Sequence, residues 1–362
     1  MNKTGLQLQQ RVLDLIARGI DQPMSYIEFD QLARAIFAFQ FEANPVYRAY
    51  CVQQGHTPET VKYWTEIPAV PTQVFKEFAL TCFPVEQSVA TFHTSGTTQS
   101  KSGKHHFQTL ELYEAAIRPN FRAHLLPDDA RLPMLVLTPS PEQAPHSSLA
   151  HMMGVVTREF GSVESAFYVE GDNLLAEKLV HDLLELQWEH LPVFLLGTAF
   201  AFAHLFEHCE KNNLPFEMAE GSRVMETGGF KGRTREMSKK ELHASFEKYL
   251  GIPSSRIANE YGMTELSTQF YDQTLRTGQQ TDRKAIPPWS RVQIIDPHTG
   301  RESAPSERGM IRIFDLANLW SVLCVQTEDL GVAHDTGFEV LGRVADAEVR
   351  GCSLNAEALS PK

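Results

Sequence analysis

The class of fold follows from the stretch LPVFLLGTAFAFAHLFEHC, residues 191–209. It begins with a short apolar run, and after Thr198 its apolar side chains recur at the spacing of an amphipathic helix. A short buried strand followed at once by such a helix is the repeating unit of a parallel sheet covered by helices. The stretch therefore predicts an α/β protein.

The same alternation extends over residues 88–286, which we expect to form an α/β core. The expected strands are SVATFHT (88–94), LPMLVLT (132–138), SRVMETG (222–228) and RIANEYG (256–262), and the expected helices include LELYEAAIRPNF (110–121) and SKKELHASFEKYL (238–250). In α/β sheets, ligands bind at the carboxyl ends of the strands. We therefore expect the polar loops that follow three of these strands, near residues 94, 228 and 262, to meet in one cleft.

The segments on either side of this core do not show the alternation of strands and helices. Residues 1–87 read as helical, with a capping-box pattern at Ser25 and Glu28. Over residues 287–342, short strand patterns follow one another with no long helix between them, which predicts a small β-barrel or antiparallel sheet. Residues 343–362 read as a short polar tail.

Composition excludes several classes of function. Of the 362 residues, 42% are hydrophobic and 22% are charged, as in an ordinary globular protein. A formal net charge of −12 argues against nucleic acid or an anionic membrane as partner. We find no secretory signal and no apolar stretch long enough to span a bilayer. Five scattered cysteines without a CxxC pair favour a reduced, cytoplasmic protein.

The loop after the first expected strand is rich in hydroxyl side chains and glycine. Its candidate phosphate-binding residues are Thr94, Ser95, Gly96, Thr97, Thr98, Lys101 and Lys104. Free backbone N–H groups, hydroxyls and ammonium groups all bind phosphate oxygens. The loop is not a P-loop, because six residues separate Gly96 from Gly103 and a histidine follows Lys104. An exposed flexible loop is the alternative interpretation.

A second polar loop, NEYGMTE, covers residues 259–265. The carboxylate of Glu265 is a candidate Mg²⁺ ligand, and the Thr264 hydroxyl is a candidate donor to a phosphate oxygen. The ring of Tyr261 is a candidate platform for a base. The alternative is a helix N-terminus at which Glu265 complements the helix dipole.

In their order along the chain, these loops resemble the motifs of the adenylate-forming superfamily, which includes acyl-CoA synthetases, peptide-synthetase adenylation domains and beetle luciferases. The matching elements are residues 94–98, Gly228 with Gly229, residues 261–265, residues 327–329, and Gly342 and Arg343 with Asp346. The resemblance implies the fold of that superfamily's N-terminal domain, an α/β fold with mostly parallel sheets and flanking helices. It also leads us to expect that the mobile C-terminal domain is absent.

The resemblance implies ATP and Mg²⁺ as cofactors. In the superfamily the first loop covers the phosphates, the paired glycines line the adenine, YGxTE contacts adenine, the α-phosphate and magnesium, and TGD holds the ribose. The implied nucleotide-binding residues are Thr94, Ser95, Gly96, Thr97, Thr98, Gly228, Gly229, Tyr261, Gly262, Asp329 and Arg343, with Thr264 as a catalytic donor and Glu265 as the magnesium ligand. Gln99 and Glu328 depart from the pattern, since each stands where glycine is usual.

Without the C-terminal domain, the chain also lacks that domain's catalytic lysine, and another cation has to neutralise the phosphates. The candidates are Lys101, Lys104, Lys231 and Arg343. We favour Lys104 and Lys231 as catalytic residues.

The whole chain resembles more closely the acyl-protein synthetases of bacterial bioluminescence operons, the LuxE type, through FHTSGTT, PHSSLAHMMGVV, NEYGMTEL and the terminal RGCSL. The resemblance implies that the chain activates a long-chain fatty acid with ATP and carries the acyl group on a cysteine near its C-terminus. It also implies an acyl-CoA reductase as the partner that accepts the acyl group. The cysteine that matches is Cys352.

The chemistry of a thioester suits a cysteine on a flexible tail, because its thiolate has to reach the carbonyl of an acyl adenylate. Arg350 lies two residues from Cys352 and favours the thiolate, and Gly351 allows close approach of the backbone. The alternative is that Cys352 is an ordinary tail residue. We expect the other cysteines, Cys51, Cys82, Cys209 and Cys324, to be buried.

The segment PHSSLAHMMG resembles the superfamily's HxxG-type segment near the acyl carboxylate. It makes His151, Met152 and Gly154 candidate acyl-substrate residues, and packing in the core is the alternative for His151 and Met152. We expect no zinc at His204 and His208, because HLFEH is not HExxH.

Two other functions stay open at the level of sequence. One is an acyl-AMP ligase that delivers acyl groups to CoA or to a carrier protein in another pathway. The other is a non-catalytic nucleotide-binding subunit.

Overall fold

The computed structural model describes residues 2–94, 102–228 and 237–343. It divides into two compact units, each built from segments that are far apart in the sequence. Unit 1 comprises Met1–Asn120, Met263–Gln269 and Arg283–Lys362, and unit 2 comprises Phe121–Gly262 and Phe270–Asp282. This division follows packing, whereas the boundaries expected at residues 87, 286 and 342 follow chain order and remain a prediction.

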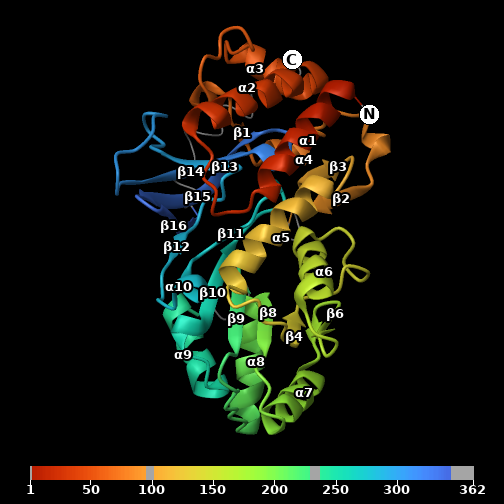
Figure 1. Cartoon of the computed structure of the whole chain (residues 1–362), viewed down its shortest axis with the longest axis vertical. Helices are drawn as coiled ribbons and strands as arrows, with labels where there is room; N and C mark the ends of the chain where they lie inside the picture. The colour runs from red at the N-terminus through yellow and green to blue at the C-terminus, as the bar shows by residue number, and fades with distance from the viewer. Residues whose placement is uncertain (1, 95–101, 229–236, 344–362) are drawn as a thin grey trace. The chain divides into compact units, whose positions relative to one another are not determined.

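Unit 2 is built on a six-stranded sheet in the order β11-β10-β9-β8-β4-β5. The strands are β4 (Met134–Leu137), β5 (Ala166–Phe167), β8 (Phe194–Thr198), β9 (Arg223–Thr227), β10 (Ile257–Tyr261) and β11 (Phe270–Tyr271). All neighbouring pairs from β10 to β5 are parallel, and β11 runs antiparallel to β10. The parallel sheet expected from residue 132 onward is therefore confirmed (Figure 1).

Helices cover the sheet of unit 2. They are α6 (Ser148–Phe160), α7 (Ala176–Trp188), α8 (Ala199–Asn212), α9 (Lys239–Leu250) and the short α10 (Thr274–Thr277), with a small hairpin of β6 (Val169–Glu170) and β7 (Asn173–Leu174) between α6 and α7. The stretch at 191–209 forms β8 and α8 as expected. Phe202 of α8 meets Phe246 of α9 edge to face at 4.8 Å, and both side chains are fully buried. The burial of such a ring stabilises the fold by roughly 1.5–3 kcal/mol.

Unit 1 combines the N-terminal helices with a second sheet. The helices are α1 (Lys3–Ala17), α2 (Tyr26–Ala43), α3 (Pro45–Gln53) and α4 (Val74–Glu77), and α5 (Glu111–Leu125) begins in this unit. The capping box at the start of α2 is present, since Ser25 accepts from the Glu28 backbone and Glu28 accepts from the Ser25 backbone. The expected helical character of the N-terminal segment is confirmed for α1 to α3 (Figure 1).

The sheet of unit 1 follows the order β12-β16-β15-β14-β13, with β1 (Val70–Pro71) pairing in parallel with β15. Its other strands are β12 (Arg283–Lys284), β13 (Ser290–Ile295), β14 (Arg308–Asp315), β15 (Cys324–His334) and β16 (Gly337–Arg343). All pairs along this path are antiparallel. The β-rich segment after residue 287 thus forms an antiparallel sheet, and residues 327–329 lie within its strand β15.

One expectation about the fold is wrong. The strand SVATFHT was expected in the parallel sheet, but β2 (Ala90–His93) pairs antiparallel with β3 (Lys104–Phe107) in a separate two-stranded sheet. The sequence KHHF has no apolar run and so gives no strand signal. Its alternation nevertheless buries His105 and Phe107 and leaves Lys104 exposed, which is the pattern of a half-buried strand.

Candidate active site

The base of the 94–103 loop is closed by a reciprocal pair of hydrogen bonds. The Thr94 amide donates to the Gly103 carbonyl over 2.9 Å, and the Gly103 amide donates to Thr94 Oγ1 over 2.8 Å. A Cβ at position 103 would lie 3.1 Å from Thr94 Cγ2 and 3.4 Å from Phe75 Cβ, so the tight closure favours glycine. Thr94 therefore fixes the ends of the loop, and Ser95, Gly96, Thr97, Thr98 and Lys101 lie outside the described residues.

Thr264, in the second predicted loop, contacts both strands of this hairpin. Its carbonyl accepts a hydrogen bond from His105 Nδ1 on β3 over 2.8 Å. Its hydroxyl donates to the carbonyl of His93 on β2 over 3.3 Å. Residues 263–269 belong to unit 1, as do β2 and β3. The structure thus brings Thr264 against the base of the predicted phosphate loop.

The same segment is also bonded to the end of β14 and to the 3-10 helix Leu316–Asn318 that follows it. Asn318 Nδ2 donates to the Glu265 carbonyl over 2.8 Å, and Asn318 Oδ1 accepts from Ser267 Oγ over 2.6 Å. Asp315 accepts from the Ser267 amide at 2.9 Å and from Thr268 Oγ1 at 2.8 Å. Burial raises the pKa of Asp315 to about 6, against these donors, which lower it. The backbone on which Glu265 stands is therefore bonded by two separate parts of the chain, the β2–β3 hairpin and the segment 315–318.

Glu265 itself is 8% exposed. Mg²⁺ in nucleotide sites is commonly held by one or two carboxylates together with the phosphates of the substrate. A carboxylate on a fixed backbone, next in sequence to a threonine at the loop base, fits that mode of binding. The alternative, a helix N-terminus at Glu265, is wrong, because residues 263–266 form a turn closed by a hydrogen bond from the Leu266 amide to the Met263 carbonyl.

Asp329, predicted to bind the ribose, lies on β15, and Arg343, a predicted nucleotide-binding residue, lies on β16. Asp329 and Arg343 are directly opposite in the strand register, and Asp329 Oδ1 is 3.7 Å from Arg343 Nε. Glu328, which replaces the usual glycine, lies 3.9 Å from Arg343 Nη1 through Oε2 and accepts a hydrogen bond from Gln73. The departure at Glu328 thus adds a second carboxylate beside Arg343.

In unit 2, the register places Gly228 and Tyr261 at neighbouring strand ends. Thr227 of β9 pairs with Glu260 of β10, and Gly228 and Tyr261 are the residues that follow. Gly228 has φ +71°, a conformation that favours glycine. Gly262 follows Tyr261 and is exposed, whereas Gly229 and Lys231 lie outside the described residues. The first part of NEYGMTE therefore belongs to unit 2 and the last part to unit 1.

Sequence reasoning missed the buried carboxylates at these strand ends. Glu226 accepts from Asn259 Nδ2 over 2.8 Å, and its Oε1 lies 3.8 Å from His243 Nε2 of α9. Glu260 accepts a hydrogen bond from the Thr227 hydroxyl. The sequence signal that could have found these carboxylates is the alternation of polar and apolar residues in RVMET and IANEY. They fix the ends of β9 and β10 that carry the predicted glycine and tyrosine.

The predicted acyl-substrate residues lie on α6, which begins after the cap Ser147. His151 is half-buried, and Met152 is fully buried, with its sulfur accepting from the Tyr271 hydroxyl at 3.6 Å. A Cβ at Gly154 would lie 2.3 Å from Pro141 Cγ, so the glycine lets the segment before α6 approach the helix. Met152 accordingly packs in the core of unit 2.

The four cysteines within the described residues are all buried and unpaired, as expected. Burial raises the pKa of the Cys51 thiol to about 12 and that of Cys209 to about 11, and it raises the pKa values of Cys82 and Cys324 still further. Since the thiolate is the nucleophile, these four are unsuited to carry an acyl group. Cys352 and Asp346 lie outside the described residues.

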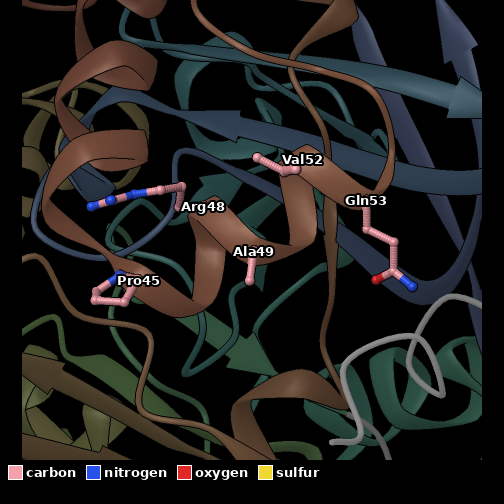
Figure 2. Close-up of a pocket in the computed structure, with 5 residues that line it drawn as sticks. All are labelled: Pro45, Arg48, Ala49, Val52 and Gln53. Atoms are coloured by element: carbon pink, nitrogen blue, oxygen red, sulfur yellow. The ribbon is translucent and has the colours of Figure 1, made fainter. Parts of the chain in front are cut away.

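A shallow hollow elsewhere in unit 1 contains none of the predicted residues. Its lining consists of Pro45, Arg48, Ala49, Val52 and Gln53, all on α3 (Figure 2). The Arg48 guanidinium donates to the Phe41 and Glu42 carbonyls, so it binds main-chain acceptors at the C-terminal end of α2. In the described part of the chain, no helix is both long and apolar enough to cross a membrane.

The fold is that of the adenylate-forming ligases. The chain is similar to a crystal structure of 2-hydroxyisobutyryl-CoA ligase, an open conformation in complex with 2-HIB-AMP and CoA, with a TM-score of 0.66, 15% identity, and coverage of 90% of this chain and 72% of that one. It is also similar to ATP-bound MatB from Rhodopseudomonas palustris, with a TM-score of 0.52, 16% identity, and coverage of 74% and 50%. The fold class expected from the sequence is confirmed.

Residues 16–360 match the family described as acyl-protein synthetase, LuxE, and the chain belongs to that family. Two relatives are long-chain-fatty-acid–luciferin-component ligases. The one from Aliivibrio fischeri is 23% identical over 341 residues, covering 90% of this chain and 87% of the relative. The one from Vibrio harveyi is 22% identical over 357 residues, covering 94% and 92%. The predicted class of enzyme, an acyl-protein synthetase, is confirmed.

Proposed function

We propose that this chain activates a long-chain fatty acid with ATP, receives the acyl group on Cys352 as a thioester, and passes it to an acyl-CoA reductase partner. The names of the two relatives support the choice of fatty acid and the link to bioluminescence. The observation that carries the proposal is the double contact of Thr264 with the hairpin, because it joins two sequence motifs at one place.

In the first half-reaction, an oxygen of the fatty carboxylate attacks the α-phosphorus of ATP, and pyrophosphate leaves. No general base is required, since the carboxylate is ionised near neutral pH. Thr264 and the 94–98 loop would donate to the phosphates, and Lys104, exposed at the start of β3, is a candidate for a cation at the loop. Mg²⁺, which Glu265 would hold, neutralises phosphate charge when it is bound.

In the second half-reaction, the thiolate of Cys352 attacks the carbonyl carbon of the acyl adenylate. The bond from that carbon to the phosphate oxygen breaks, AMP leaves with the electron pair, and a thioester remains. The burial of Cys51, Cys82, Cys209 and Cys324 supports this assignment, since it leaves Cys352 as the remaining thiol of the sequence. We infer that the reaction takes place in the cytoplasm, where thiols stay reduced.

Isotope exchange between pyrophosphate and ATP tests the first half-reaction. We expect exchange that depends on a fatty acid and on Mg²⁺. If no chain length from short to long supports exchange, the chain is a nucleotide-binding subunit and the enzymatic proposal fails.

Labelling with a radioactive fatty acid and ATP tests the second half-reaction. The wild type should acquire a protein-bound label that hydroxylamine releases, and Cys352→Ser should keep pyrophosphate exchange but lose that label. Addition of an acyl-CoA reductase should remove the label from the wild type. Equal thioester label on both proteins would reject Cys352, and label that moves only to CoA or a carrier protein would support the acyl-AMP ligase alternative.

A further inference from the structure

A buried histidine whose side chain has one polar contact among the described residues lies at the base of the candidate site. His105 is 2% exposed and lies opposite Phe92 in the hairpin register. Its ring meets Phe107 at 4.2 Å and Phe75 at 5.8 Å. Its Nδ1 lies 2.8 Å from the main-chain oxygen of Thr264. Aromatic rings therefore pack against the imidazole, and its Nδ1 contacts the Thr264 carbonyl.

The protonation state of this ring follows from its surroundings. Burial lowers the pKa of His105 to about 4, with the neighbouring His106 lowering it further and the bond to Thr264 opposing the shift. The ring is therefore neutral near pH 7. Because a carbonyl can only accept, the proton of the neutral ring is on Nδ1. His105 is thus a fixed donor and not an acid or a base for the reaction.

We propose that His105 is a positioning residue for adenylate formation: its Nδ1–H holds the Thr264 carbonyl, and through it the Thr264 hydroxyl and the Glu265 carboxylate, at the base of the 94–103 loop. The inference rests on the proposed function, because it explains how the residues of that site are held in position. The inference also gives a role to the histidine that follows Lys104, where a P-loop would have serine or threonine.

The rest of the contact network makes this bond consequential. The Thr264 hydroxyl donates to His93 over 3.3 Å, a longer and weaker bond than the one from His105. Asn318 donates to the carbonyl of the next residue, Glu265. Without His105, the Thr264 carbonyl would lose the shorter of these two hydrogen bonds to the hairpin. Misplacement of a reacting group by about 1 Å lowers a rate by roughly 100-fold.

A matched pair of variants tests the proposal. In His105→Asn, Nδ2 lies close to where Nδ1 was and still donates, whereas His105→Leu has a similar size and no donor. We expect His105→Leu to lower kcat/KM for MgATP in fatty-acid-dependent pyrophosphate exchange by roughly 30–100-fold. His105→Asn should recover most of this loss, to within about 5-fold of wild type, a ratio worth about 1 kcal/mol. The KM for the fatty acid should change little in either variant.

A neighbouring histidine supplies the control. His106 Nδ1 lies 3.1 Å from Thr91 Oγ1 on the other face of β3, and His106→Asn and His106→Leu should differ by less than about 3-fold. Thermal unfolding of all four proteins separates loss of fold from loss of position. If His105→Asn and His105→Leu lose activity equally, or only in proportion to their unfolded fraction, His105 has a packing role and the inference fails. If the wild type itself shows no exchange, the proposed function fails first.

Discussion

Asn318 donates from its side chain to the main-chain oxygen of Glu265 over 2.8 Å, while its own oxygen accepts from Ser267 over 2.6 Å. The amide thus matches a donor and an acceptor within one short segment. Asn318 is 2% exposed, so neither partner can be replaced by bulk water. This one amide therefore helps to hold the backbone that carries the candidate magnesium ligand.

Asn318→Asp tests that dependence. The variant keeps the acceptor for Ser267 and turns an oxygen toward the Glu265 carbonyl, so two acceptors face each other. We expect the free energy of unfolding to fall by about 2–3 kcal/mol, measured by chemical denaturation. Pyrophosphate exchange should fall more than the folded fraction does. An unchanged exchange rate in folded protein would show that Glu265 does not depend on this contact.

Glu265→Gln removes the charge and keeps the shape. We expect pyrophosphate exchange to fall by roughly 100-fold, because a neutral amide is a poor Mg²⁺ ligand. The concentration of Mg²⁺ needed for half-maximal rate should rise, which a titration at fixed ATP measures. Glu260→Gln would not be a suitable control, because the Glu260 carboxylate already accepts a hydrogen bond from the Thr227 hydroxyl. An equal magnesium requirement in Glu265→Gln and wild type would reject Glu265 as the ligand.

Asp329→Asn removes a charged acceptor opposite Arg343 on the neighbouring strand. We expect the KM for ATP to rise by roughly 10-fold with a smaller change in kcat, because the ribose hydroxyls lose a charge-assisted bond. Steady-state kinetics with varied ATP measure both constants. Glu328→Gly, which restores the usual glycine, is the companion variant. If Asp329→Asn lowers kcat and leaves KM unchanged, the residue does not bind the ribose in the ground state.

A prediction on stability concerns Asp128 and Arg223 of unit 2. Arg223 is buried and donates from both terminal nitrogens to the Asp128 carboxylate at 2.8 and 2.6 Å. Arg223 lowers the pKa of Asp128 to about 2. A depressed carboxyl pKa contributes stability that is present above pH 4 and is lost as the pH falls from about 4 to 2. Asp128→Asn should flatten the pH dependence of unfolding in that window.

The adjacent Asp129 provides the control for this measurement. It pairs with Arg122 at 2.7 Å, and both side chains are more than 60% exposed. Asp129→Asn should leave the free energy of unfolding at neutral pH close to that of the wild type, because an exposed ion pair contributes little. Asp128→Asn should cost about 2 kcal/mol or more, since it removes the charge and one of the two acceptor oxygens that face the buried Arg223. Equal costs for the two variants would contradict a special role for the buried pair.

The strand Phe194–Thr198 was predictable because it begins as a short apolar run, and Arg223–Thr227 also lies where its pattern indicated. The strand Lys104–Phe107 was not, because two of its residues are histidines and only its tertiary contacts bury them. In the same way, spacing pointed to Thr264 and Glu265, but His105 lies 159 residues from the group it bonds. Residues that support a site from a distance have no local signature.

The burial of four thiols has a practical consequence for experiments on the whole chain. The sequence contains five cysteines, and four of them lie inside the folded units with raised pKa values. A thiol that alkylates rapidly while the chain is folded is therefore Cys352. A fluorophore or spin label can be attached at that one position without a cysteine-free background, and ATP with a fatty acid should protect the same position from the reagent.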